Sequence, residues 1–332
     1  MLSRSLAPRS PKQRRRRGPS QSRSSPAAGE GWLCDRVVSL IVGMWSLQGS
    51  AHAAMKKRFD MHSVQVAYTD EGHGRPFVLV HGAGANGSYW KLLAAHLAQA
   101  HADARIVAPD LFGHGDTPPW TPAQLAGRQA ARNYDYTDDV QLLEQLADRI
   151  EGDFDLVGHS SGGAVCLQYA LRNPARVRKL VVAEPMLPGI LSAADPAAHA
   201  EVTRAYERAH AAVDSGESEQ AARCLFEYIL GDGQWSQLGD GIRKWMTKNV
   251  ACTLAAHSRA SLAMRLPADH FEAIACPVLM LFGERTRAPF RRVCGVIADS
   301  LANVRSVAIP KAAHNAPLTH APMVNEAIAA FL

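Results

Sequence analysis

The sequence predicts an α/β protein in which helices cover both faces of a mostly parallel sheet, from about residue 60 to the C-terminus. Short apolar runs alternate with stretches of helical period, which is typical of such a sheet. The runs are too apolar for half-exposed strands, as expected when both faces are covered. Of the 332 residues, 47% are apolar, enough for a large core.

The expected strands follow in order along the chain. The first alternates with a period of two from Val64 to Tyr68. Six apolar runs then predict six further strands, at residues 75–82, 104–110, 153–160, 179–185, 277–284 and 304–310. The segment "APMVNEAIAAFL" predicts a closing helix.

A long stretch between the fourth and fifth of these runs has no strand-like pattern. Residues 186–276 instead hold Ala-rich segments of helical period, such as "HAEVTRAYERAHAAV" and "EQAARCLFEYIL". We therefore expect a core domain made of residues 55–185 and 277–332, with 186–276 inserted as a helical cap. The cap should lie over the carboxyl edge of the sheet, where ligands of open α/β sheets bind.

The positive charge of the chain is concentrated at its beginning. The formal net charge is +5, but residues 1–28 hold eight of the 36 Lys and Arg residues and no acid. The rest of the chain has 28 basic against 31 acidic residues. A mildly acidic body argues against a nucleic-acid partner.

Residues 1–54 are expected to be a leader outside the fold. Their first part is rich in Arg, Ser, Pro and Gly and should be disordered. The apolar run "VVSLIVGMWSL" is about half as long as a membrane span, so none is expected. A true start near Met55 and a cytoplasmic location are favoured; export with cleavage after Ala53, at "AHA", is the alternative.

The segment "GHSSGG" offers two adjacent serines after a predicted strand and before a predicted helix. A nucleophile on a sharp strand-to-helix turn needs very small residues two positions before and after it. Ser160 has Gly158 and Gly162 at these positions, whereas Ser161 has His159 two positions before it. Ser160 is therefore the candidate nucleophile.

A serine nucleophile requires a base and donors for the developing oxyanion. His314 lies on the loop after the last predicted strand and is the candidate base. The backbone amides of Ser161, after the nucleophile, and of Ala83, in the small-residue loop "HGAGANGSYW", are the candidate oxyanion donors. Cysteine and histidine spacing predicts no metal site, and no cofactor is expected.

Four motifs carry a resemblance to a known superfamily: "HGAGA", "APDLFGHGDT", "GHSSGG" and "AAHNAP". Over residues 60–332 the chain resembles the α/β-hydrolase fold superfamily, of the capped esterase, lactonase and haloalkane-dehalogenase type. The resemblance implies an eight-stranded, mostly parallel sheet with a helical cap. It also implies that His81, Asp110 and His114 stand at positions that are usually structural.

The third member of the expected triad departs from the family pattern. The resemblance implies an Asp where Thr286 stands, in "GERT". Some relatives carry the acid one strand earlier, where "LVVAEPM" places Glu184, and this residue is favoured as the acid; Glu284 is the alternative. Pro185 is expected to bias the backbone of Glu184 to an extended form.

The sequence therefore predicts a serine hydrolase that cleaves a carboxylic ester or lactone through a Ser-His-Glu triad and an acyl-enzyme. Alternatives are an acyltransferase or carbon–carbon bond hydrolase on the same residues, or a non-catalytic ligand-binding protein. Phe226, Trp235 and Trp245 favour a small, hydrophobic ester substrate, although they could equally pack the cap itself. The sequence leaves the oligomeric state open.

Overall fold

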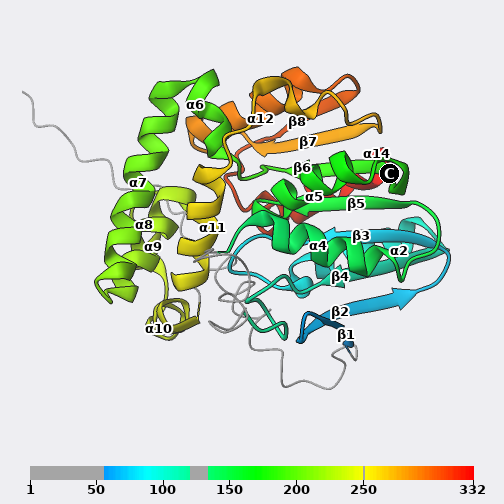
Figure 1. The fold of residues 1–332 in the computed structure, drawn as a ribbon, viewed down its shortest axis with the longest axis horizontal. Coiled ribbons are helices and arrows are strands. Elements are labelled where there is room, and N and C mark those ends of the chain that lie inside the picture. Colours follow the sequence, from blue (N-terminus) through cyan, green and yellow to red (C-terminus); the bar gives the residue numbers. More distant parts are fainter. Residues whose placement is uncertain (1–55, 120–133, 250) are drawn as a thin grey trace, which may run out of the picture.

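The computed structural model describes residues 56–119, 134–249 and 251–332. They form an eight-stranded sheet with helices on both faces and a further group of helices beyond one edge (Figure 1). The expectations for residues 1–54, including the start at Met55 and cleavage after Ala53, lie outside the described residues. Within the described part of the chain, no helix has the length and apolar character needed to cross a membrane.

The sheet is mostly parallel, as predicted. Its strands lie in the order β1-β2-β4-β3-β5-β6-β7-β8, and only the β1–β2 and β2–β4 pairs are antiparallel. The strands are β1 (Lys57–Met61), β2 (Val64–Gly72), β3 (Arg75–Val80), β4 (Ala104–Pro109), β5 (Phe154–His159), β6 (Val177–Ala183), β7 (Val278–Gly283) and β8 (Val304–Ile309).

One strand was missed by the sequence analysis. β1 precedes the predicted first strand and pairs with β2 along its whole length. Three of its five side chains are exposed and only Phe59 and Met61 are buried, so it has no apolar run. The alternation of these two apolar residues was the available signal.

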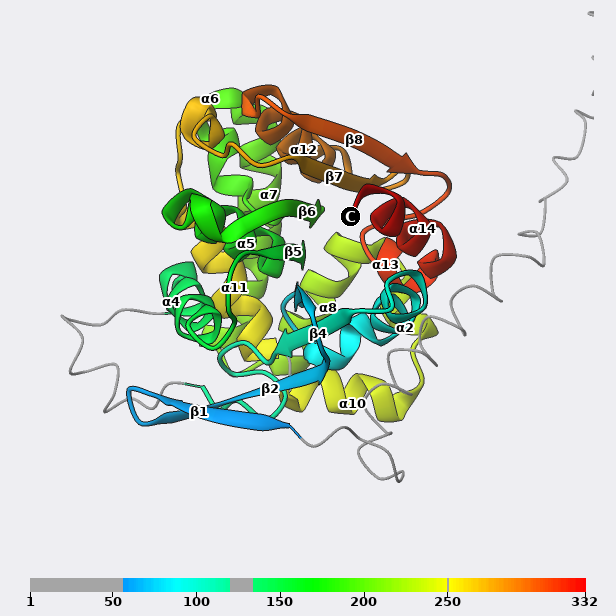
Figure 2. The same ribbon diagram turned by 90° about the vertical axis from the view of Figure 1, so that its right-hand side faces the viewer.

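Two apolar cores lie on opposite faces of the sheet because successive strand residues point to opposite sides. Leu156 and Leu180 join one core, and their neighbours Val157 and Val181 join the other. Figure 2 shows α4 and α5 on one face and α2 and α14 on the other. The helices of the two faces are α4 (Tyr136–Ala147), α5 (Ser161–Arg172) and α12 (Ala288–Ser300), and α2 (Lys91–Ala100), α13 (Ala316–Thr319) and α14 (Ala321–Phe331).

Helices alone fill the described residues between β6 and β7, and they lie beyond the carboxyl ends of the parallel strands (Figure 1). Their own small cores include Tyr206, Leu225 and Tyr228 in one cluster, and Phe226 and Trp235 in another. The helices are α6 (Leu191–Ala194), α7 (Pro196–Asp214), α8 (Ser218–Leu230), α9 (Gln234–Gln237), α10 (Asp240–Asn249) and α11 (Ala251–Ala263), with 3₁₀ turns η4 (Pro188–Ile190) and η5 (Ala268–Phe271).

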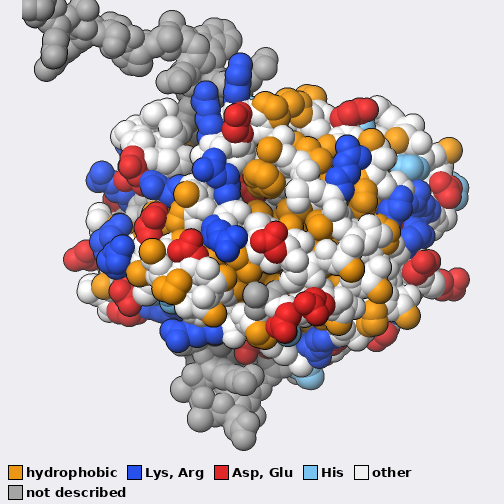
Figure 3. Space-filling model, turned by 90° about the horizontal axis from the view of Figure 1, so that it is seen from above, with side chains coloured by type: hydrophobic (Ala, Val, Ile, Leu, Met, Phe, Trp, Pro, Cys, Tyr) orange, Lys and Arg blue, Asp and Glu red, His pale blue; other side chains and the backbone are white. Residues whose placement is uncertain are grey.

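Charged side chains of both signs are mixed over the face seen from above, with apolar side chains scattered between them (Figure 3). The ion pair between Arg292 and Asp299 on α12 is of this surface type, with 3.9 Å between the charged atoms. Such exposed pairs contribute little, typically about 0–1 kcal/mol. This pair therefore contributes little to the stability of the fold.

Two buried histidines hold the loops that follow β3 and β4. Nε2 of His81 accepts a hydrogen bond from the Leu111 amide at 3.0 Å, and Nε2 of His114 accepts one from the Gly84 amide at 3.0 Å. Accepting nitrogens must be unprotonated. Burial is the main cause that lowers the pKa of His81 to about 4 and that of His114 to about 3.

These depressed pKa values predict acid sensitivity. The ordinary histidine pKa is near 6.5. Between about pH 6.5 and 4 the unfolded chain therefore binds protons that the folded chain excludes. The free energy of unfolding decreases as the pH is lowered through this range. Each histidine contributes up to about 1.4 kcal/mol of unfolding free energy per pH unit. The variant His114→Gln cannot titrate at this position. We expect its free energy of unfolding to fall less steeply than that of wild type from pH 6.5 through 5.5 to 4.5, as measured by urea unfolding.

The comparison with a variant is needed because a buried carboxyl changes the free energy of unfolding with pH in the opposite direction. Burial raises the pKa of Asp139 to about 7, so this group favours the folded state on acidification. Wild type and variant share Asp139, and its effect cancels in the difference. Parallel pH curves for wild type and both His114→Gln and His81→Gln would contradict the prediction.

Candidate active site

Ser160 lies at the sharp turn between β5 and α5. Its backbone has φ 56° and ψ −123°, a conformation that non-glycine residues rarely adopt and that often marks functional sites. A Cβ on Gly158 would lie 2.6 Å from Cys166 Sγ, and one on Gly162 would lie 2.2 Å from the His81 carbonyl oxygen. The turn therefore excludes side chains two positions before and after Ser160.

His314 lies within hydrogen-bond distance of both of its expected partners. Its Nε2 is 3.0 Å from Ser160 Oγ, and its Nδ1 is 2.7 Å from Glu184 Oε2. All three side chains are buried. The tautomer with the proton on Nδ1 donates to the carboxylate and leaves Nε2 free to accept the serine proton. The structure thus brings together the favoured nucleophile, base and acid.

The backbone of Glu184, directly after β6, has a φ angle of 45°. The expectation of an extended backbone before Pro185 was therefore wrong. Its Oε1 accepts from the Gly283 amide and the Thr286 hydroxyl, each at 2.7 Å. Burial alone would raise the pKa of this carboxyl. The charge and hydrogen bond of His314, with the two other donors, outweigh it and hold the pKa below its usual value.

Glu284, the alternative acid, lies away from His314. Its side chain is exposed, and its Oε2 accepts from the Lys311 amide at 2.9 Å. Thr286 stands where the resemblance implied an acid, and it donates to the carboxylate of Glu184. This contact was not predicted from the sequence, because Thr286 and Glu184 lie 102 positions apart and no local pattern links them.

The two candidate oxyanion donors, the backbone amides of Ser161 and Ala83, belong to different segments that both line the pocket with Ser160. Ser161 is the first residue of α5, so no preceding turn of that helix supplies an acceptor for its amide. In the loop after β3, the Gly84 amide donates to His114 and that of Ala85 donates to the Gly82 carbonyl. The Ala83 amide has no hydrogen-bond acceptor among the described residues, and Ala83 lines the pocket.

His159 was not singled out by the sequence analysis. Its Nε2 donates to the His314 carbonyl oxygen at 2.9 Å, and its ring stacks on that of Tyr89 with 5.1 Å between centroids. Burial, with the charge of His314, lowers the pKa of His159 to about 3, so its ring is neutral. His159 thereby ties the loop that carries His314 to the end of β5.

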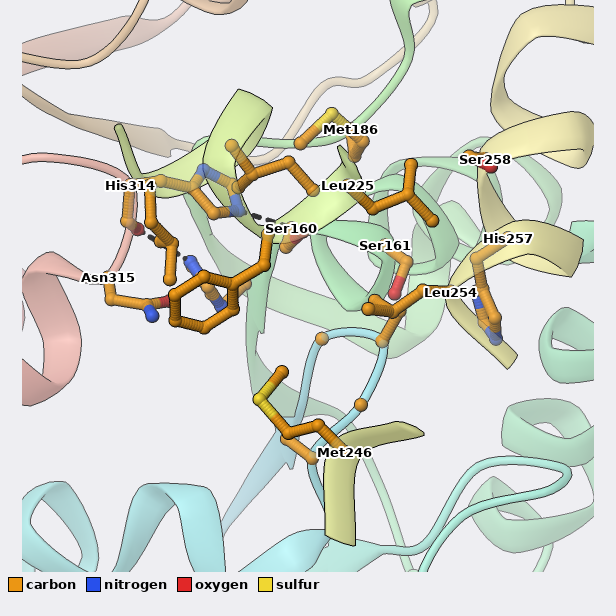
Figure 4. Close-up of a pocket in the computed structure, with 18 of the residues that line it drawn as sticks. Ser160, Ser161, Met186, Leu225, Met246, Leu254, His257, Ser258, His314 and Asn315 are labelled. Carbon is orange, nitrogen blue, oxygen red and sulfur yellow. Dashed lines mark hydrogen bonds between the residues drawn. The ribbon is translucent and has the colours of Figure 1, made fainter. Parts of the chain in front are cut away.

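A cavity of about 140 Å³, counted as space open to the centres of water molecules, lies between Ser160 and the helices that follow β6. A single buried water needs only about 10–15 Å³. The lining of the cavity is mainly apolar and includes Phe226, Trp245 and Met246. Trp235 packs on Phe226 but does not line the cavity. Figure 4 shows His314, Ser160 and Met246 around this space.

No group of His, Cys, Asp and Glu side chains in the described ranges is arranged to hold a metal ion. The polar groups gathered at Ser160 instead suit proton transfer between a hydroxyl and an imidazole. A buried carboxylate in this position would stabilise the positive charge that forms on the imidazole during such a transfer. The arrangement can therefore generate a serine alkoxide next to an apolar cavity.

Proteins of known name resemble parts of this chain. A 2-hydroxy-6-oxo-2,4-heptadienoate hydrolase of Pseudomonas putida is 37% identical over 114 residues, 34% of this chain and 38% of that enzyme. A haloalkane dehalogenase of Sphingobium indicum is 30% identical over 129 residues, 39% of this chain and 41% of that enzyme. The chain thus matches less than half the length of these relatives.

A solved structure of a thermophilic esterase from Thermogutta terrifontis, with malate bound, has the same fold. Its TM-score is 0.61 at 20% identity, and the match covers 84% of this chain and 98% of that chain. The sequence profile of the alpha/beta hydrolase family matches residues 77–327, from β3 into α14. The protein described here is therefore a member of the alpha/beta hydrolase family.

Proposed function

We propose that this protein is a serine hydrolase that cleaves a carboxylic ester or lactone through an acyl-enzyme. The observation that carries the proposal is the buried hydrogen-bond chain from Glu184 through His314 to Ser160. It ends at a nucleophile held in the strained backbone of a strand-to-helix turn. The Thermogutta terrifontis esterase shares the fold. This fold hosts many reactions, so the proposal rests on the geometry of the site itself.

The first half of the proposed reaction acylates the serine. Ser160 Oγ attacks the carbonyl carbon while His314 Nε2 takes its proton, and Glu184 stabilises the imidazolium that forms. The amides of Ala83 and Ser161 donate to the negative oxygen of the tetrahedral intermediate. The carbon–oxygen bond to the alcohol then breaks, and the alcohol leaves with the proton from Nε2.

The second half restores the enzyme with water. His314 takes a proton from a water molecule, whose oxygen attacks the carbonyl carbon of the acyl-enzyme. The bond to Ser160 Oγ breaks, the serine regains its proton from Nε2, and a carboxylic acid is released. The named side chains and amides supply every proton transfer and charge interaction in both halves.

The cavity favours a substrate with apolar groups. We assign residues 186–276 the role of a cap, because its helices α8, α10 and α11 supply Phe226, Trp245 and Leu254 to the lining. Burying an apolar group against such side chains contributes about 25 cal/mol per Å². An ester with a hydrophobic acyl or alcohol part is therefore the preferred substrate class.

A heptadienoate is a carboxylate, and the described lining offers no Lys or Arg side chain to pair with one. Burying an unpaired carboxylate is costly. This feature favours a neutral ester over the substrate class of the Pseudomonas putida relative.

The nucleophile can be tested directly. A fluorophosphonate probe should label the protein, and mass spectrometry of the labelled peptide should place the adduct on Ser160. Ser160→Ala should abolish labelling and p-nitrophenyl ester hydrolysis, because no other group near His314 Nε2 can take the place of the hydroxyl. Ser236→Ala, a change at an exposed cap serine, is the matched control. An adduct on Ser161 would contradict the assignment.

The acid can be tested with an amide substitution. In Glu184→Gln the amide oxygen should stay where Gly283 and Thr286 donate, which turns the NH₂ group towards His314 Nδ1. The imidazole must then carry its proton on Nε2 and cannot accept from Ser160. We expect kcat to fall about 10⁴-fold, as measured at fixed pH with p-nitrophenyl esters.

Glu284→Gln is the matched control for that substitution. Glu284 is exposed and contacts the Lys311 amide, so its kcat should stay within about twofold of wild type. A Glu184→Gln variant that turns over as fast as the Glu284→Gln variant would remove Glu184 from the mechanism.

A further inference from the structure

Four side chains that line the cavity, Tyr89, His159, Ser161 and His257, each carry a buried polar atom without a hydrogen-bond partner among the described residues. The rings of Tyr89 and His159 stack on each other. The side chains of Ser161 and His257 have no role in the proposed proton transfers. Their exposed fractions are only 2% and 4%. Ser161 Oγ and His257 Nδ1 are buried and have no hydrogen-bond partner among the described residues. Leaving such a group unsatisfied costs about 1–3 kcal/mol, so each one requires an explanation.

The two side chains lie on one side of the nucleophile. In Figure 4, Ser161 and His257 appear on the side of Ser160 away from His314. His314 protonates the leaving alcohol, so the alcohol part of an ester must lie near its Nε2. The acyl part then extends to the opposite side, where Ser161 and His257 lie.

Packing holds the His257 ring in place. It lies 4.2 Å from the ring of Tyr134, centroid to centroid, and meets the His114 ring edge-on at 5.1 Å. Burial, with the charges of His114 and His81, lowers the pKa of His257 well below 6.5. The neutral ring has one N–H donor and one acceptor nitrogen.

The described lining carries no charged side chain of Lys, Arg, Asp or Glu. A carboxylate or ammonium group in this part of the cavity would lose its hydration without gaining a counter-charge. A hydroxyl and a neutral imidazole can each donate one hydrogen bond to an uncharged oxygen. They therefore suit a ketone or a hydroxyl group.

We propose that Ser161 Oγ and His257 form a polar subsite that binds a neutral ketone or hydroxyl oxygen on the acyl chain of the substrate. This inference deepens the proposed function and rests on it for the direction of the acyl chain. The remainder of the cavity accepts the hydrocarbon part of the chain. The substrate class is thus an oxo- or hydroxy-acyl ester rather than a plain fatty ester.

The test compares p-nitrophenyl hexanoate with oxohexanoate esters whose ketone is at carbon 3, 4 or 5, and with the adipate monoester, which carries a carboxylate. Each kcat/KM is divided by the rate of hydroxide hydrolysis of the same ester. We expect at least one oxo ester to exceed hexanoate by about tenfold, and adipate to fall below it.

Ser161→Ala and His257→Leu should each bring the oxo-to-hexanoate ratio down towards one. The ratio cancels general losses of activity, and either variant suffices if the other fails to fold. Ser236→Ala and His96→Leu, at positions outside the cavity lining, should leave the ratio as in wild type. A ratio near one in wild type, a preference for adipate, or an unchanged ratio in both subsite variants would overturn the subsite.

Binding separates this inference from the proposed function. Titration calorimetry of Ser160→Ala with methyl hexanoate and the three methyl oxohexanoates measures the preference without turnover. Tighter binding of an oxo ester together with an inactive wild-type enzyme would support the subsite and refute the ester hydrolase. Turnover of esters without a preference for an oxo ester in either the kinetic or the binding measurement would support the ester hydrolase and refute the subsite.

Discussion

The carboxylate of Glu184 is the interaction on which the geometry of the candidate site depends. It receives hydrogen bonds from Gly283 at the end of β7, from Thr286 after that strand, and from His314 after β8. A buried carboxylate is costly unless several donors satisfy it. The same three contacts that stabilise the charge therefore fix the ends of β6 and β7 and the loop after β8 relative to one another.

The strand-to-helix turn imposes a second constraint, which is steric. Ser160 adopts a positive φ angle, and its carbonyl accepts from the amides of Ala164 and Met186. Gly158 and Gly162 leave room for the turn to pack against Cys166 and the His81 carbonyl. Strain at Ser160 is thus balanced by backbone hydrogen bonds and close packing on either side of it.

Sequence patterns predicted the parallel sheet, the helical insertion and the residues that meet at Ser160, because apolar runs and glycine spacing reflect local constraints. β1 was not predicted, because charged residues surround its only two buried apolar residues, Phe59 and Met61. Two hydrogen bonds were also not predicted: the one from Thr286 to Glu184 and the one from His159 to the His314 carbonyl oxygen. Both join residues more than 100 positions apart in the chain, and no local pattern encodes such pairings.

The two ends of the helical segment between β6 and β7 lie close together in space, since a Cβ on Gly189 would lie only 2.5 Å from the Met264 carbonyl oxygen. The entropy of closing a loop grows only slowly with its length, so helical segments of very different size fit the same two anchor points. The lining of the cavity can thus change through exchange of one contiguous segment after Met186. Evolution or a protein engineer could alter selectivity in this way while the strand ends that hold Ser160 and Glu184 stay where they are.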